Sequence, residues 1–194
     1  MRYLIVDTAN TFFRARHSAH RQSDTWDKLG FAIHVTLGSV NKAWRDQKAD
    51  HVVFCLEGRS WRKDYYEPYK KNRAVARAAL TESEQEEDRL FWEAFDNLKT
   101  FLAEKTNCTV LQHPELEADD LIAGFIHAHP NDDHVIISSD TDFYQLLAPN
   151  VPLCTKHVAA LRARRVQAGG WMRAVAVVSR DINLALQPKR RAQW

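Results

Sequence analysis

The sequence has few cysteines, few glycines and no long apolar run, and each scarcity excludes a class of protein. Its three cysteines are far apart and form no Cys-x-x-Cys pair, which argues against a zinc site or disulfide framework and favours a reducing cytoplasm. No apolar run is long enough to cross a bilayer and no signal peptide is visible, so we expect no membrane contact. The six glycines form no glycine-rich phosphate loop.

Charge is present in quantity but is unevenly distributed. Residues 153–194 contain nine Lys and Arg against one acid, a net charge of +8, so residues 1–152 carry −6 of the total of +2. With 194 residues, 45% of them hydrophobic, the chain can build one sizeable core. We therefore predict a globular domain over residues 1–152 and an atypical basic tail over residues 153–194.

Strand-like and helix-like segments alternate, which predicts an α/β fold with a mainly parallel central sheet flanked by helices. Strands are expected at 2–6, 51–56, 108–112 and 134–139, helices at 28–47, from 82 to about 106 and from 117 onward, and a polar loop at 17–27. The second helix begins with the capping-box pattern Thr81-x-x-Glu84. Its expected buried stripe is Phe91, Ala94, Phe95, Leu98 and Phe101 or Leu102.

Carboxylates follow the expected strands at the points where those strands end. Asp7, Glu57 and the pair Asp140 and Asp142 each follow an apolar run, while Glu117, Asp119 and Asp120 stand where a helix begins. Because the carboxyl ends of parallel strands share one edge of a sheet, these seven side chains are expected to converge. Converging carboxylates need compensation, which hard divalent cations with oxygen ligands supply. The pattern predicts a magnesium-dependent enzyme acting on phosphates.

Each acidic group also has an alternative explanation. An acidic first turn complements the helix dipole without any metal, and Asp is common in turns and caps. Phosphotransferases of the haloacid dehalogenase type also place Asp-x-Asp after a strand. In those enzymes the pair follows the first strand, where this chain has Asp7-Thr8-Ala9.

A basic and aromatic segment follows Glu57 directly. We call residues 58–80 the arch; its basic and aromatic residues are Arg59, Trp61, Arg62, Lys63, Tyr65, Tyr66, Tyr69, Lys70, Lys71, Arg73 and Arg77. Basic side chains neutralise phosphates, and aromatic faces between them stack unpaired bases, so this composition is typical of a channel for single-stranded nucleic acid. The alternative is a solvated basic surface whose aromatic residues belong to the core.

Four motifs in register resemble the 5′-3′ exonuclease and flap endonuclease family, especially its bacteriophage members. They are Ile5-Val6-Asp7-Thr8-Ala9-Asn10, then Trp61-Arg62 with Glu67-Pro68-Tyr69-Lys70-Lys71-Asn72-Arg73, then Glu117-Ala118-Asp119-Asp120, then Ser139-Asp140-Thr141-Asp142. The resemblance covers about residues 1–150. It implies a PIN-like nuclease domain that hydrolyses DNA near a 5′ end or flap, in the cytoplasm of a bacterial or phage-infected cell. It also implies two Mg²⁺ ions, for which Mn²⁺ could substitute.

The resemblance also assigns expected roles to residues. By position, seven acids match the family's metal ligands or the residues that support those ligands: Asp7, Glu57, Glu117, Asp119, Asp120, Asp140 and Asp142. We expect the first four to hold one ion and the last three to lean toward the other. Lys70 and Arg73 match the residues that handle the scissile phosphate. Expected DNA-binding residues in the surrounding arch are Arg59, Arg62, Lys63, Tyr69, Lys71 and Arg77.

Two departures from the family pattern stand out. The family usually has Asp where this chain has Glu57, whose longer side chain can still bind a metal. After its Asp-x-Asp strand the family continues into a Gly- and Asp-rich segment with further ligands and a helix–hairpin–helix-like element, and nothing after Pro152 resembles these. We interpret residues 153–194 as the product of a truncation or frameshift; an evolved basic DNA-binding tail is the alternative.

Three functions therefore stay open on sequence grounds. The preferred one is a metal-dependent 5′-3′ exonuclease or flap endonuclease, with no order of preference between the two activities. A non-catalytic DNA-binding module would use the same groove and arch. A PIN-type ribonuclease would need a similar carboxylate pocket but no long arch. No protein partner is indicated.

Overall fold

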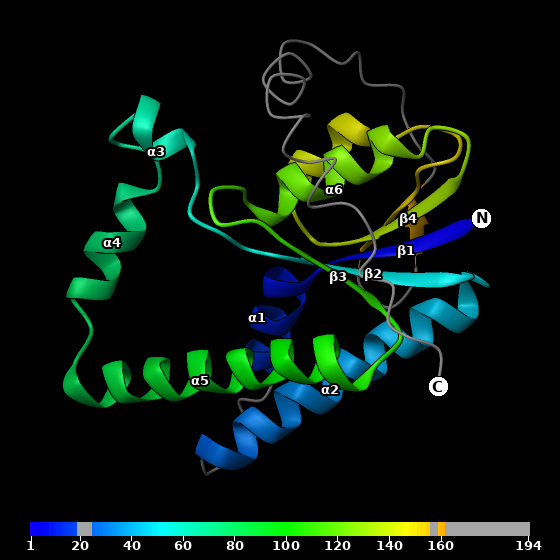
Figure 1. Cartoon of the computed structure of the whole chain (residues 1–194). Coiled ribbons are helices and arrows are strands. Elements are labelled where there is room, and N and C mark those ends of the chain that lie inside the picture. The colour runs from blue at the N-terminus through cyan, green and yellow to red at the C-terminus, as the bar shows by residue number, and fades with distance from the viewer. Residues whose placement is uncertain (19–24, 156–158, 162–194) are drawn as a thin grey trace.

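The computed structural model describes residues 1–18, 25–155 and 159–161 (Figure 1). Its elements in chain order are β1 (Arg2–Asp7), α1 (Thr8–Ser18), α2 (Thr25–Asp46), β2 (His51–Leu56), α3 (Arg62–Tyr65), α4 (Lys71–Ala78), α5 (Glu82–Lys105), β3 (Thr109–Gln112), α6 (Ala118–Ala128), β4 (Asp133–Ile137), the 3₁₀ helix η1 (Thr141–Leu146), β5 (Leu153–Thr155) and β6 (Ala159–Leu161). The alternation of strands and helices confirms the predicted α/β class.

The strands form one sheet in the order β3-β2-β1-β4-β5-β6. Neighbours from β3 to β5 pair in parallel, and β6 pairs antiparallel with β5. In this register Val6 lies opposite Phe54 on one side and Ile137 on the other. The carboxyl ends of β1, β2 and β4 are therefore level, which is the arrangement that brings the residues after each strand together.

The sheet is buried on both faces. Leu4 and Val6 of β1 belong to the core formed with α1, α2 and α5, whereas Ile5 belongs to the core formed with α6 and η1. Figure 1 shows α5 and α2 on one side of the sheet and α6 on the other. Because successive side chains of a strand point to opposite faces, two covered faces require continuous apolar strands, as the sequence has.

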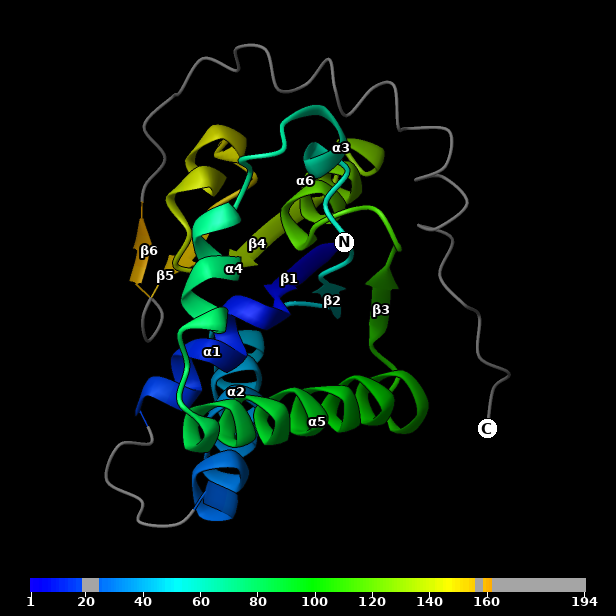
Figure 2. The ribbon, with the colours of Figure 1, turned by 90° about the vertical axis from the view of Figure 1, so that its left-hand side faces the viewer.

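The arch stands outside the sheet. Its two short helices, α3 and α4, connect the end of β2 to the start of α5, and no residue of either helix is buried. Figure 1 shows α4 standing off from the sheet, with α3 at one end and the start of α5 at the other, and Figure 2 shows the same segment from the side. The segment is poor in aliphatic residues and contains Pro68, which disfavours a place in the sheet.

Helix α5 begins as predicted. The Thr81 hydroxyl accepts from the Glu84 backbone N–H at 3.4 Å, and the Glu84 carboxylate accepts from the Thr81 N–H at 2.8 Å, which completes the capping box. Along the predicted stripe Leu102 is buried, whereas Phe101 is 45% exposed. In the described part of the chain, no helix is both long and apolar enough to cross a membrane.

Helix α1 was not predicted, because the expected order had one helix between the first two strands and a loop from residue 17 to 27. Ala9, Phe12 and Ala15 are buried at three-residue spacing, so α1 packs on the sheet with one narrow stripe. The interleaved Thr, Arg and His residues hide that stripe in the sequence. Residues 19–24 of the expected loop lie outside the described residues, and α2 begins earlier than expected, at Thr25.

The sheet extends beyond residue 152. Leu153 is fully buried, and β5 pairs with β4 through Ile136 opposite Leu153. A division based on charge could not detect this extension, because a strand of three residues contributes little to composition. The boundary between domain and tail stays a prediction, and residues 156–158 and 162–194 lie outside the described residues.

Candidate active site

The carboxylates expected at the sheet edge lie at the ends of three neighbouring strands. Asp7 is the last residue of β1, Glu57 directly follows β2, and Asp140 follows β4 after two serines. Cys55 of β2 lies opposite Asp7, which places Glu57 two residues beyond it. The fold therefore brings to one edge groups that are up to 133 residues apart in sequence.

Asp7 is the most buried of these three, with 7% of the residue exposed. Its carboxylate accepts from the Ser138 hydroxyl at 2.8 Å and from the Asn10 backbone N–H at 3.2 Å. Burial raises the pKa of Asp7 to about 6 against the lowering effect of these hydrogen bonds, and the nearby charges of Asp119 and Asp140 raise it further. The Asp7 carboxylate thus lies in a region of uncompensated negative charge.

Glu57 lies close to the start of α6. Its carboxylate accepts from the Ala118 backbone N–H at 3.3 Å. Desolvation by the surrounding protein raises the pKa of Glu57, Lys70 opposes this rise, and the charges of Glu117 and Asp7 add to it. Glu57 is therefore within electrostatic reach of acidic groups from both β1 and α6.

Backbone pairing holds the foot of the arch against the segment that leads into α6. Three hydrogen bonds join the two segments: Gly58 N–H to Leu116 O at 2.8 Å, Arg59 N–H to Pro114 O at 2.7 Å and Trp61 N–H to Glu115 O at 2.9 Å. A Cβ atom on Gly58 would lie 2.0 Å from the carbonyl oxygen of His113. Only glycine permits this approach, and it fixes Glu57 relative to Glu117.

Glu117 is the N-cap of α6, is 4% exposed and collects four side-chain donors. Its Oε2 atom accepts from Ser60 at 2.9 Å, Arg62 at 2.9 Å and Tyr69 at 2.7 Å, and its Oε1 atom accepts from the Lys70 ammonium. Burial raises the pKa of Glu117, but the bonds from Lys70, Tyr69 and Ser60 outweigh it and hold that pKa below its ordinary value. Glu117 is therefore ionised and bound to the arch.

Asp120 faces the same arginine. The Arg62 guanidinium donates NH1 to Asp120 Oδ2 at 2.9 Å and NH2 to Oδ1 at 2.8 Å, a two-point contact. Asp120 Oδ2 also accepts from the Glu117 backbone N–H at 3.1 Å. Asp120 is 3% exposed, so this contact is shielded from water.

Asp119 lies beside the Arg62–Asp120 pair but makes no hydrogen bond to Arg62. Its Oδ2 atom is 4.0 Å from Arg62, and its Oδ1 atom accepts from the Asp120 backbone N–H at 2.9 Å. Burial and the charge of Asp120 raise the pKa of Asp119 to about 7, although Arg62 lowers it. Within the described residues, carboxylate oxygens of Glu117, Asp119 and Asp120 lie within 4.8 Å of one another, close enough to hold a metal ion.

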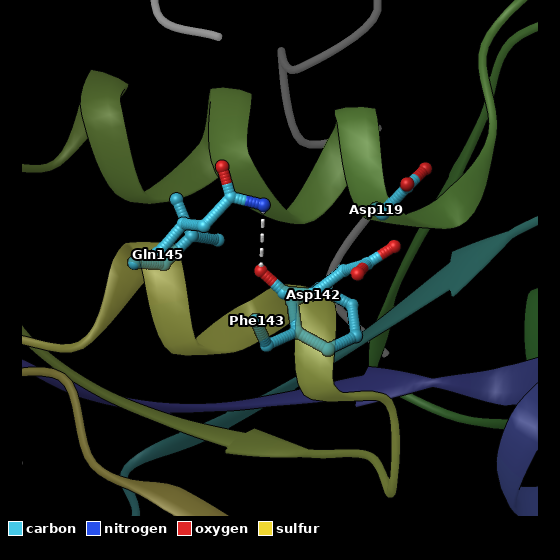
Figure 3. Close-up of a pocket in the computed structure, with 5 residues that line it drawn as sticks. Asp119, Asp142, Phe143 and Gln145 are labelled. Atoms are coloured by element: carbon cyan, nitrogen blue, oxygen red, sulfur yellow. Dashed lines mark hydrogen bonds between the residues drawn. The ribbon is translucent and has the colours of Figure 1, made fainter. Parts of the chain in front are cut away.

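Asp140 and Asp142 begin η1 and are exposed. The Asp140 carboxylate accepts from the Asp142 backbone N–H at 3.0 Å. Asp142 and Asp119 line one small open pocket together with Phe143, Gln145 and Leu146. Figure 3 shows the two carboxylates, one from α6 and one from η1, on the same side of that pocket. Each of the seven predicted acidic residues is thereby connected to another through a hydrogen bond, through the effect of its charge on a neighbour's pKa, or through the shared pocket.

The arch residues divide into two groups. Arg62, Tyr69 and Lys70 reach the carboxylates, and Lys70 does so from a left-handed backbone conformation with φ 54°. Lys63 and Arg73 are exposed. The remaining expected DNA-binding residues are exposed and contact other side chains: Arg59 pairs with Asp64, Lys71 with Glu67 at 2.9 Å, and Arg77 lies over the Trp92 ring at 5.5 Å.

Sequence reasoning missed two buried serines and did not foresee the partners of one arginine. Ser60 and Ser138 donate to Glu117 and Asp7, and their hydroxyls carry no pattern that separates them from loop serines. Arg62 was expected in a DNA channel, but only 14% of its side chain is exposed. Its position directly after Trp61 gives no signal of partners more than 50 residues away.

The residues present suit a divalent cation. Oxygen ligands from carboxylates are what Mg²⁺ and Mn²⁺ prefer. Burial, and in addition the charges of neighbouring carboxylates, raise the pKa values of Asp7 and Asp119. A cation among these carboxylates would compensate their negative charge.

A family model and the related proteins identify the same family of nucleases. The model of the 5′-3′ exonuclease N-terminal resolvase-like domain matches residues 2–170. The flap endonuclease Xni of Shewanella loihica is 31% identical over 156 residues, which cover 78% of this chain and 54% of that protein. DNA polymerase I of Rhizobium leguminosarum is 28% identical over 161 residues, which cover 76% of this chain and 14% of the polymerase. The chain spans about half the length of the Xni relatives it matches.

Solved structures share the fold. The T5 5′-exonuclease with bound divalent zinc ions superposes with a TM-score of 0.71 at 22% identity, over 84% of this chain and 58% of that one. A complex of the bacteriophage T5 flap endonuclease with DNA and metal ions superposes with a TM-score of 0.63 at 24% identity, over 80% of this chain and 55% of that one. These likenesses confirm the PIN-like α/β fold.

Proposed function

Because the chain belongs to the family of the 5′-3′ exonuclease N-terminal resolvase-like domain, we propose that it hydrolyses DNA phosphodiester bonds near a 5′ end or flap with divalent cations. The observation that carries the proposal is the cluster of the Glu117, Asp119 and Asp120 carboxylates directly beside a basic arch, with Lys70 of the arch reaching Glu117. The DNA and metal complexes of the T5 enzymes and the names of the Xni relatives support it.

The proposed cations are two Mg²⁺ ions, with Mn²⁺ as a substitute. Asp7, Glu57, Glu117 and Asp119 would hold one, and Asp140 and Asp142 would hold the other. Asp142 lines the same pocket as Asp119. When bound, such ions would lower the pKa of a coordinated water and stabilise the leaving oxygen of a phosphodiester.

The chain's own residues have complementary tasks. The buried hydrogen bonds to Asp7 and Glu117 keep these carboxylates oriented, so little rearrangement is needed when a cation binds. Lys70 and Arg73 would neutralise negative charge on the scissile phosphate. Lys70 has its ammonium at the carboxylate cluster, and Arg73 is close enough for its charge to lower the pKa of Lys70. The exposed basic residues of the arch would contact backbone phosphates of the 5′ strand.

The test is cleavage of a 5′-labelled flap duplex, run with Mg²⁺ and with a chelator. The informative variant is Asp140→Ala, because Asp140 is exposed and its loss should not unfold the protein. Glu104→Ala, an exposed acid at the far end of α5, removes the same charge as a control. We expect product with Mg²⁺ for the wild-type protein and Glu104→Ala, and none for Asp140→Ala or with chelator.

The same assay distinguishes the alternatives. Binding of the flap duplex without cleavage, unchanged by chelator, would refute the proposal in favour of a DNA-binding module. Faster cleavage of a matched RNA substrate than of DNA would favour the ribonuclease. Comparing a flap with a recessed 5′ end would separate endonuclease from exonuclease activity.

A further inference from the structure

Arg62 occupies an unusual place among the basic residues of the arch. It is the first residue of α3, yet its guanidinium lies against the first turn of α6, 58 positions away, where it contacts Asp120 at two points and Glu117 at one. Trp61 and Tyr69 flank it, with ring centres 5.1 Å and 5.9 Å from the guanidinium carbon. The guanidinium is thus enclosed by aromatic rings and carboxylates and is little exposed.

The two aspartates of α6, Asp119 and Asp120, differ in whether their carboxylate oxygens are available to bind a cation. Both oxygens of Asp120 accept from Arg62, and Oδ2 accepts from the Glu117 N–H as well. Asp119 Oδ2 lies 4.0 Å from Arg62, beyond hydrogen-bond distance, and Asp119 lines the open pocket with Asp142. A cation approaching from that pocket meets Asp119 first, whereas Asp120 could bind it only by giving up its pairing with Arg62.

Such a pairing is costly to break. A carboxylate and a guanidinium that are both shielded from water interact strongly, and removing one leaves the other charge buried without its partner. The planar fork of arginine matches both carboxylate oxygens, which a lysine ammonium cannot do. The pair therefore acts as a fixed brace between the foot of the arch and the start of α6.

We propose that Arg62 is a positioning residue that withholds Asp120 from cation binding and fixes the first turn of α6, so that Asp119 and not Asp120 serves as the cation ligand there. This inference rests on the proposed function only in assuming that the carboxylate cluster binds divalent cations. It gives Arg62 a role inside the protein and removes it from the residues that contact DNA in the arch.

The matched pair Asp119→Asn and Asp120→Asn tests the assignment without any nuclease assay. Calorimetric titration with Mg²⁺ and Mn²⁺ should show a loss of affinity of about a hundredfold for Asp119→Asn and less than about tenfold for Asp120→Asn, since only the first removes a direct ligand. Without cation, Asp120→Asn should lower the melting temperature because Arg62 loses its two-point contact with a carboxylate. Asp119→Asn should raise the melting temperature, because it removes one of several neighbouring negative charges.

The role of Arg62 is tested by the cation's effect on the melting temperature. Arg62→Met frees the Asp120 carboxylate, so Mg²⁺ should raise the melting temperature of this variant more than that of the wild type. Adding Asp120→Asn to Arg62→Met should abolish the extra rise. Arg62→Lys keeps the charge but not the fork, and should restore only part of the stability in the absence of cation. If Arg62→Met does not fold, the comparison of Asp119→Asn with Asp120→Asn still tests whether Asp120 is withheld from the cation.

The outcomes separate the two proposals. A wild-type protein that binds neither Mg²⁺ nor Mn²⁺ would overturn the proposed function. If the wild type binds the cation and the two Asn variants lose affinity equally, only the proposal that Asp120 is withheld from the cation would be overturned. An equal rise in melting temperature for the wild type and Arg62→Met would count against the role of Arg62.

Discussion

Replacing Asp7 with Asn should stabilise the metal-free protein at neutral pH. The raised pKa of Asp7, about 6 against an ordinary 3.8, means that the folded protein disfavours the ionised carboxylate. At 1.36 kcal/mol for each pKa unit, the ionised form costs about 3 kcal/mol of folding free energy, as an upper bound. Asn has nearly the same shape and can exchange hydrogen bonds with Ser138 and Asn10, so it removes the charge with little disturbance.

The sign of the pH dependence follows from linkage. Between pH 3.8 and about 6 the folded state binds more protons at Asp7 than the unfolded state does. The free energy of unfolding contributed by this group is therefore highest below pH 3.8, falls as the pH rises through that window, and is level above it. Asp7→Asn lacks this dependence. His51 and His134, whose pKa values burial lowers, titrate in both proteins and cancel in the difference.

Urea unfolding in chelator at pH 4.5 and pH 7.5 measures the effect. The advantage of Asp7→Asn over the wild type should grow by up to about 2 kcal/mol between the two pH values. Adding Mg²⁺ at pH 7.5 should reverse the order, because the cation stabilises the wild type and the variant lacks a ligand. A variant less stable than the wild type at pH 7.5 in chelator, or a difference independent of pH, would refute this reasoning.

Two further predictions concern the scaffold. Gly58→Ala should lower the free energy of unfolding by about 3 kcal/mol or more and weaken Mg²⁺ binding, since its methyl group would meet backbone of residues 113–116. Gly38→Ala, exposed on α2 with open space around it, should instead add about 0.5–1 kcal/mol. Thr81→Ala removes the α5 cap and should cost about 1 kcal/mol with Mg²⁺ affinity unchanged. Urea unfolding and calorimetry measure all three, and a Gly58→Ala protein as stable as Gly38→Ala would contradict the close-packing argument.

Some features of the fold are local enough to be predicted from sequence. The strands were located because a strand covered on both faces needs a continuous apolar run, and the capping box at Thr81 depends on residues three apart. The convergence of Asp7, Glu57 and Asp140 follows from one general property of parallel sheets. Helix α1 was missed because its buried stripe is narrow and lies among polar residues.

The chemistry of the site depends on contacts between distant segments. That Arg62 pairs with Asp120, and that Lys70 reaches Glu117, depends on how the arch is attached at Gly58. The pattern of residue types presents both Asp119 and Asp120 as cation ligands, because a motif shows spacing but not partners.

The sequence by itself determined which carboxylates reach the edge of the sheet, since strand ends and helix starts are set by local patterns. Only the tertiary structure decided which of them are compensated. Burial and neighbouring charge raise the pKa of Asp7 and Asp119, while a shielded guanidinium neutralises Asp120. Solvation and the distance between charges are properties of the packed molecule, and they have no counterpart in the order of residues along the chain.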